Sequence, residues 1–180
     1  TFDCAWGADD IPEILDILDK NNAKATFFVV GLWAEKYPDM VKLMASKGHD
    51  VSNHGFAHLH CGQISEEKIE EEILLCDKII EKLTGRSNRL FRCPYGEYDS
   101  KTVETARKLG FTTIQWDVDS LDWKKSMSKK DIYERVIKKV TPGSVILFHN
   151  DTQYTVEILP DILNNLISNG YECLKVSDLL

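Results

Sequence analysis

Four of the five histidines lie in one stretch, HDVSNHGFAHLH, which covers residues 49–60. His54 and His58 are four residues apart, and on a helical turn this spacing places both imidazoles on the same side. Two imidazoles placed in this way can chelate one divalent ion. The spacing therefore predicts a metal site at His54 and His58, although HxxxH alone also fits a polar loop. We interpret His49 and His60 as loop residues or as support for the ligands.

Carboxylates and a further histidine follow other apolar segments. Asp3 lies in the opening TFD, and the stretch WDVDSLDWKK (116–125) contains Asp119 and Asp122. His149 ends the apolar run SVILFH. A carboxylate can accept a proton or orient a histidine, and a histidine can transfer a proton. The alternatives are a solvated acidic loop for the aspartates and a buried, hydrogen-bonded side chain for His149.

The stretch LFRCPYG (90–96) ends a strand pattern with Arg92. Pro94 and Gly96 predict a tight turn directly after it. Backbone N–H groups exposed by such a turn can hold an oxyanion. Taken alone, the stretch favours an ordinary turn with a surface arginine.

These side chains need elements that position them, and the sequence predicts alternating strands and helices. Strand patterns occupy the opening TFD and residues 24–30, 49–53, 89–92, 111–116, 144–149 and 171–176. Helical patterns occupy residues 11–22, 38–48, 66–85, 100–110, 129–140 and 156–170.

Alternation with short connections predicts a parallel sheet in an α/β fold, and without any linker we expect one domain over residues 1–180. A nearly closed β/α barrel and an open doubly wound sheet both fit this order. The candidate residues fall at the C-terminal ends of different strands: Asp3, His54, Arg92, Asp119 with Asp122, and His149. In a β/α barrel these ends converge on one active-site face, which favours the barrel.

Composition narrows the possible partners. The net charge of −7 argues against nucleic acid or an anionic membrane as the main partner, and it suits a neutral or partly cationic amino sugar. No apolar run reaches the roughly 18 residues of a membrane span. The five cysteines contain no CxxC pair, which argues against a cysteine-rich zinc site.

Several motifs occurring in order resemble the polysaccharide deacetylases of the NodB-homology class, carbohydrate esterase family four. TFDC resembles the usual TFDD, HGFAH resembles the His-x-x-x-His metal motif, and RCPYG resembles RxPYG. DSLDW resembles DxxDW, and LFH resembles LxH. The resemblance covers essentially the whole chain, and FDCAWG is similar to FDxxWG of the sporulation-associated PdaB-type subgroup.

The resemblance implies a distorted (β/α)7 barrel, with the first strand truncated at its start, that removes acetyl groups from a polysaccharide with the help of a divalent metal. Zinc is expected first and cobalt second. By the same resemblance, Asp3 is the general base, His149 is the general acid, and His54 and His58 hold the metal.

The remaining roles are also implied by the resemblance. Asp122 would orient His149, and Arg92 would pair with Asp3. The backbone N–H of Tyr95 would stabilise the oxyanion, while Trp123 and Leu147 would form the walls of the acetyl pocket.

Cys4 departs from the family pattern, because the second aspartate of TFDD is usually the third protein ligand. Asp10 at the start of the first helix is our first candidate to replace it, since Gly7 would permit a sharp turn. Asp9, a Cys4 thiolate and water alone are the alternatives. Gly55 also replaces the Ser or Thr usual in the metal motif.

We expect a peptidoglycan N-deacetylase outside the cytoplasm, in the cell wall or spore envelope, with a polysaccharide as partner and a monomeric state. The alternatives are a carbohydrate-binding pseudoenzyme that has lost its metal and an O-acetyl (xylan) esterase of the same family.

Overall fold

In the computed structural model, which describes residues 1–180, packing divides the chain into two compact units. The first unit comprises residues 1–26 and 116–180, and the second comprises residues 27–115. No helix is long and apolar enough to span a membrane. The single catalytic domain over residues 1–180 stays a prediction.

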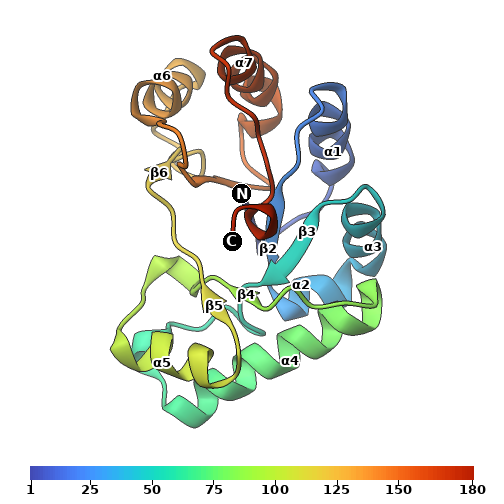
Figure 1. Ribbon diagram of the computed structural model, residues 1–180, viewed down its shortest axis with the longest axis vertical. Helices are drawn as coiled ribbons and strands as arrows, with labels where there is room; N and C mark the ends of the chain where they lie inside the picture. The colour runs from blue at the N-terminus through green and yellow to red at the C-terminus, as the bar shows by residue number, and fades with distance from the viewer. The chain divides into compact units, whose positions relative to one another are not determined.

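Strands and helices alternate along the chain (Figure 1). The strands are β1 (Phe2–Cys4), β2 (Thr26–Val29), β3 (Asp50–Asn53), β4 (Leu90–Phe91), β5 (Thr112–Thr113), β6 (Val118–Asp119) and β7 (Ile146–His149). The α-helices are α1 (Ile11–Lys20), α2 (Gly31–Lys36), α3 (Pro38–Ser46), α4 (Glu66–Thr84), α5 (Ser100–Lys108), α6 (Lys129–Lys139) and α7 (Thr155–Ser168).

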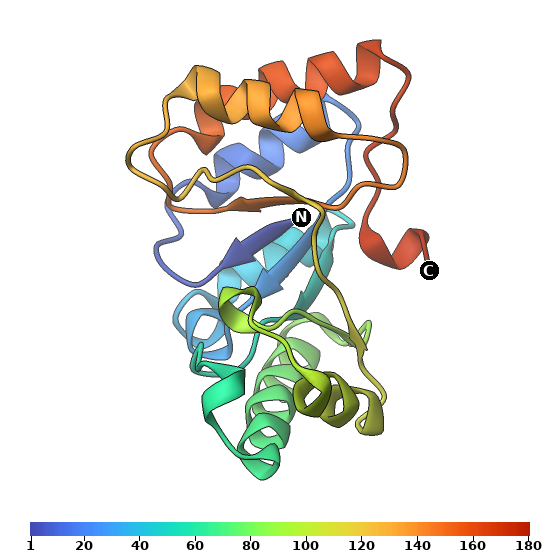
Figure 2. The ribbon, with the colours of Figure 1, turned by 90° about the vertical axis from the view of Figure 1, so that its left-hand side faces the viewer.

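In the first unit, β7 pairs in parallel with both β1 and β6. Figure 2 shows α1, α6 and α7 on one side of β1 and β7. The apolar side chains Ile11, Ile14, Leu15 and Leu18 recur at helical spacing and form the buried face of α1. Parallel pairing brings the C-terminal ends of these strands to the same edge, where the candidate residues lie.

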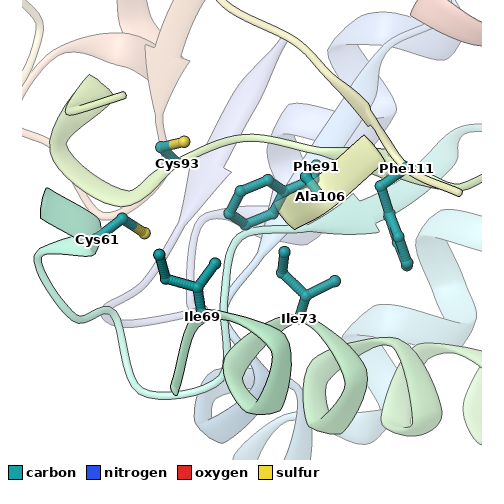
Figure 3. Close-up of a cluster of buried hydrophobic side chains, with 7 residues drawn as sticks. All are labelled: Cys61, Ile69, Ile73, Phe91, Cys93, Ala106 and Phe111. Atoms are coloured by element: carbon teal, nitrogen blue, oxygen red, sulfur yellow. The ribbon is translucent and has the colours of Figure 1, made fainter. Parts of the chain in front are cut away.

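In the second unit, β4 pairs in parallel with β3 and with β5. The long helix α4 packs against α2, α3, α5 and β3. A buried cluster joins α4 and α5 to the strand end, as Figure 3 shows: Cys61, Ile69, Ile73, Phe91, Cys93, Ala106 and Phe111. This cluster fixes the start of α4 relative to the loops that carry Cys61 and Cys93.

Local sequence signals set the helix ends as expected. Ser65 accepts a hydrogen bond from the Lys68 amide at the start of α4, and Gly85 ends this helix in the left-handed conformation. Ser128 and Asp131 form a reciprocal capping box at the start of α6. The helical patterns predicted at residues 66–85 and 129–140 are confirmed.

The prediction of a strand at residues 171–176 is wrong. The Lys24 amide donates to the Cys173 carbonyl (2.9 Å), but the Val176 amide donates to the Thr26 hydroxyl instead of to a backbone carbonyl (2.8 Å). No strand ladder forms, and Val176 begins a short 3₁₀ turn. The seventh strand of the structure is β6, which lies within the stretch at residues 116–125 and was not predicted. The short helix α2 was not predicted either.

Candidate active site

Asp3 and His149 are paired residues on neighbouring parallel strands of the first unit. Asp3 is buried, and His149 is partly buried at the end of β7. Leu147 lies two residues earlier on the same strand and is also buried. The pairing places a carboxylate and an imidazole side by side at one edge of the sheet.

Asp122 holds His149 through both of its carboxylate oxygens. Oδ1 lies 2.8 Å from the His149 ring nitrogen Nδ1, and Oδ2 accepts the His149 backbone N–H at 2.7 Å. The Thr155 hydroxyl donates to Oδ2 at 2.6 Å. Asp122 and Thr155 are themselves buried. With Nδ1 engaged as a donor to the carboxylate, Nε2 is the ring nitrogen left for chemistry.

The pKa of His149 is raised above its ordinary value of 6.5. Burial alone would lower the pKa, because it disfavours the charged imidazolium. The hydrogen bond that His149 donates to Asp122 and the negative charges of Asp122, Asp3 and Asp119 outweigh the burial. The imidazolium is therefore stabilised.

The turn after β6 gives Asp122 its position. Leu121 adopts a left-handed backbone conformation (φ +59°), which a side chain rarely takes, and its amide donates to Asp119 Oδ1 at 2.8 Å. The Ser120 hydroxyl accepts from the Asp122 amide at 3.3 Å. The stretch is thus an ordered turn, and Trp123 beyond it presents a side chain that is 53% exposed.

A second cluster in the first unit joins the loop after β1 to the loop after β7. Asp10 Oδ2 accepts from the Asp151 amide (2.7 Å), and the Gly7 amide donates to Asp151 Oδ2 (3.0 Å). The Asn150 side chain donates to the Gly7 carbonyl (2.5 Å). A Cβ on Gly7 would lie 2.7 Å from the Asp151 carboxyl carbon, so close approach explains this glycine.

Cys4 and Asp10 differ in their fitness as metal ligands. Cys4 is fully buried, and burial together with the nearby carboxylates of Asp3 and Asp10 raises the pKa of its thiol well above the ordinary value. A neutral thiol is a poor ligand. Burial also raises the pKa of Asp10, but its Oδ1 is buried and has no hydrogen-bond partner. One Asp10 oxygen thus lacks the partner that a cation would supply.

His54 and His58 come together in the second unit, but not on a helix. Both lie in an irregular loop, where Gly55 (φ +75°) and His58 (φ +56°) have left-handed conformations. Their ring centroids are 5.1 Å apart in an edge-on arrangement. The expected helical turn is therefore wrong, whereas the proximity of the two rings is present. The left-handed conformation also explains the glycine at position 55.

The buried ring of His54 is oriented by the strand beside it. Its Nδ1 lies 2.8 Å from the Arg92 carbonyl oxygen and must donate to it. The tautomer that results leaves Nε2 of His54 free of the proton and able to bind a metal, which is the usual arrangement for a histidine ligand.

Arg92 is fully buried, so the alternative of a surface arginine is wrong. Its Nε donates to the Ile114 carbonyl (3.4 Å), and its guanidinium lies over the Phe28 ring at 4.1 Å. In the turn that follows, Tyr95 has a left-handed backbone (φ +58°) and a half-exposed ring. Backbone strain of this kind is concentrated at functional sites.

The other two histidines of the cluster have separate surroundings. His49 is buried with its ring edge-on to Phe27 at 5.5 Å. His60 stacks on the Tyr95 ring at 4.0 Å and pairs with Glu97 at 2.8 Å.

Sequence reasoning missed Thr155, which supports Asp122, and Glu72, which binds the histidine loop. Glu72 had a signal: it lies on the apolar face of α4 with Ile69, Ile73 and Cys76, where a carboxylate is unusual. Neither unit by itself brings three His, Cys, Asp or Glu side chains together in a metal-binding group.

Comparisons with known proteins agree with these features. Residues 1–114 match the family model for polysaccharide deacetylases. A peptidoglycan-N-acetylglucosamine deacetylase of Bacillus cereus is 36% identical over 94% of this chain and 63% of its own length. The Bacillus subtilis peptidoglycan-N-acetylmuramic acid deacetylase PdaA is 31% identical over 100% of this chain and 70% of its own. The chain thus spans about two thirds of the length of these relatives.

Among solved structures, a Bacillus anthracis pseudoenzyme of carbohydrate esterase family four has a TM-score of 0.94 and 31% identity, over 99% of this chain and 63% of its own. A mutant of that protein is described as having restored enzymatic activity. This similarity confirms the distorted (β/α)7 barrel of the NodB type. A family match over more than half of the chain, with identities above 30% across nearly all of it, shows that the chain belongs to the polysaccharide deacetylase family.

Proposed function

We propose that this chain is the catalytic part of a metal-dependent hydrolase that removes N-acetyl groups from peptidoglycan amino sugars. The observation that carries the proposal is the buried Asp122–His149 pair, with Asp3 beside it on the paired strand. A histidine held in one tautomer beside a carboxylate is the arrangement that general acid–base catalysis requires. The activities named for the Bacillus cereus and Bacillus subtilis relatives support the peptidoglycan substrate.

In this proposal, His149 is the general acid. Its Nε2 carries the proton that the departing amine needs, since an amine is a poor leaving group unless it is protonated. Asp122 keeps the imidazolium stable and fixes the ring. Asp3 is the general base that takes the proton of the attacking water. Arg92 is proposed to keep Asp3 ionised, because a nearby cation lowers the pKa of a carboxyl group.

His54 and His58 are proposed to hold a divalent metal, zinc first and cobalt as the alternative. Such a metal would polarise the acetyl carbonyl and lower the pKa of a bound water. The fixed tautomer of His54 and the unpartnered Oδ1 of Asp10 support His54, His58 and Asp10 as the ligand set. Cys4 remains the alternative to Asp10, and its raised thiol pKa makes it the weaker candidate.

The remaining residues are proposed to bind the acetyl group and the sugar. The Tyr95 backbone N–H would stabilise the oxyanion, and the fixed left-handed turn supports a constant direction for this donor. The exposed Trp123 and the buried Leu147 would enclose the acetyl methyl. A peptidoglycan substrate places the protein outside the cytoplasm, in the cell wall or spore envelope.

A carbohydrate-binding pseudoenzyme is the second candidate, and two observations favour it. Cys4 stands where the family pattern has an aspartate, and a structurally similar protein is described as a pseudoenzyme. In a pseudoenzyme, the exposed Trp123 and Tyr95 would contact the sugar, and the Asp122–His149 pair would have a structural role alone.

The test is the release of acetate from N-acetylated peptidoglycan, chito-oligosaccharide and O-acetylated xylan, each with added Zn²⁺ or Co²⁺. Acetate from the first two substrates supports the proposal. Acetate from xylan alone would replace the proposal with an O-acetyl esterase. Glycan binding without acetate from any substrate would establish the pseudoenzyme.

A further inference from the structure

The loop that carries His54 and His58 cannot hold itself in place through helical hydrogen bonds. It runs through left-handed conformations at Gly55 and His58, so its backbone amides need acceptors from other elements. Residue Asn53 supplies one of them, because its side-chain oxygen accepts from the Gly55 amide at 2.9 Å.

The other acceptor is Glu72, which reaches the loop from α4. Its Oε2 accepts from the Phe56 amide at 3.0 Å and from the Ala57 amide at 2.7 Å. These two amides lie between the two histidines in the sequence. A single carboxylate oxygen therefore anchors the segment that sets the spacing of His54 and His58.

Glu72 is buried, and its carboxylate therefore depends on the hydrogen bonds from the loop amides. The residue is only 3% exposed, and an isolated buried carboxylate is costly. Lys68 Nζ lies 3.6 Å from Oε1, which has no hydrogen-bond partner. The charge is thus offset mainly by the two amide bonds, which are stronger than bonds between neutral groups.

Helix α2 also holds the loop. The amides of Gly31 and Leu32 donate to the carbonyls of Gly55 and Phe56, each at 2.9 Å. Residue Phe56 is therefore bonded to Glu72 through its N–H and to α2 through its carbonyl, so removing Glu72 would leave the bonds to α2 in place.

We propose that Glu72 is a positioning residue that fixes the separation of His54 and His58 for metal binding. It is proposed to act through the loop backbone, because its two hydrogen bonds run to the Phe56 and Ala57 amides. The inference rests on the proposed metal role of the two histidines, but its structural half, the ordering of residues 54–58, can be tested without any metal.

The variants are Glu72→Gln and Glu72→Ala, with Glu71→Gln as the matched control. Glu71 neighbours Glu72 on the same helix, is exposed, and also pairs with Lys68 (2.8 Å). Glu71→Gln therefore removes the same charge without touching the loop. In Glu72→Gln, the neutral side chain offers one carbonyl oxygen in place of the carboxylate, so the two amide bonds weaken while the shape is kept.

The first measurement is amide hydrogen exchange of the metal-free protein, together with circular dichroism to establish folding. Phe56 and Ala57 should exchange at least about tenfold faster in Glu72→Gln, since each factor of ten corresponds to about 1.4 kcal/mol of lost protection. Glu71→Gln should match the wild type. Unchanged exchange in a folded Glu72→Gln would overturn the proposal. If Glu72→Ala does not fold, Glu72→Gln still decides.

The second measurement is Co²⁺ titration followed by visible absorption, which reports the ligand geometry without catalysis. Glu72→Gln should bind Co²⁺ about 10- to 100-fold more weakly, with an altered spectrum, as expected for loss of a group that supports a ligand. A wild-type spectrum and affinity would contradict the positioning role. If the wild type itself binds no Co²⁺, the proposed function fails, and with it the metal half of this inference. The exchange data would still test whether Glu72 orders residues 54–58.

Discussion

Asp122 and His149 are joined twice, by a 2.8 Å contact between carboxylate and imidazole and by a 2.7 Å hydrogen bond from the His149 backbone amide. The same carboxylate thus fixes the rotation of the ring and the end of the strand that carries it. The Thr155 hydroxyl binds the oxygen that accepts the amide. A ring held in this way directs Nε2 in one direction, as a general acid requires.

Asp122→Asn should therefore lower kcat/KM by about 10²- to 10⁴-fold, the usual contribution of a positioned acid or base. The loss of negative charge should also lower the His149 pKa, so the alkaline limb of the pH profile should move to lower pH. Steady-state kinetics from pH 5 to 10 check both effects. The exposed Asp161→Asn on α7 is the control and should behave as wild type. An unshifted alkaline limb would argue against the pair.

The raised pKa of His149 also predicts a pH dependence of stability. Because the folded pKa lies above the unfolded value of about 6.5, the stabilisation is complete below that pH and is lost as pH rises through the folded pKa. The difference in free energy of unfolding between wild type and His149→Gln should therefore be largest in acid. It should shrink as the pH becomes alkaline. Urea unfolding of the metal-free proteins measures it. A difference that grows with pH would refute the assignment.

Metal content should depend on His54 and not on His60. His54→Ala removes a buried imidazole whose tautomer is set for binding, so stoichiometric Zn²⁺ should no longer be retained after dialysis. His60 is engaged with Tyr95 and Glu97, and His60→Ala is the matched control that should retain Zn²⁺. Equal metal content in both variants would show that the ligand set is wrong.

The choice between Asp10 and Cys4 can be made with the same analysis. Asp10→Ala should weaken Zn²⁺ binding, because it removes the buried oxygen that has no partner. Cys4→Ala should bind as wild type, because a thiol with a raised pKa resists ionisation. The opposite pattern would assign the thiolate as ligand, and equal binding by both variants would leave water in that place.

Gly7→Ala should destabilise the protein by about 1–2 kcal/mol. The new Cβ would displace the Asp151 carboxylate, which accepts a hydrogen bond from the Gly7 amide. In an Asp151→Ala background, the same substitution should cost much less. Thermal unfolding of the four proteins of this cycle gives the coupling. An equal cost in both backgrounds would show that close approach to Asp151 is not the reason for the glycine.

Local signals in the sequence were sufficient for most elements. Ser65, Gly85 and Ser128 mark helix ends through bonds to neighbouring residues, and such bonds need no tertiary information. Residues 171–176 alternate between apolar and polar types, as a strand would, but they do not form a strand. The Val176 amide bonds to the Thr26 hydroxyl instead of to a backbone carbonyl. Strand β6 is two residues long, too short to show any period.

The sequence likewise indicated some features of the candidate site and not others. Residue types and order indicated Asp3, Asp122 and His149, since strand ends in a parallel sheet share one edge. The left-handed loop at His58 was not foreseen, because it depends on acceptors from Glu72 and Asn53 rather than on helical spacing. Such long-range hydrogen bonds leave little trace in a single sequence.

The most direct test of the account is acetate release from N-acetylated peptidoglycan by the metal-stripped protein before and after one equivalent of Zn²⁺ is added. We predict no acetate before addition, turnover after it, and loss of that turnover in both His54→Ala and His149→Gln. Glycan binding with no acetate at any Zn²⁺ or Co²⁺ concentration would contradict the account and identify the chain as a pseudoenzyme.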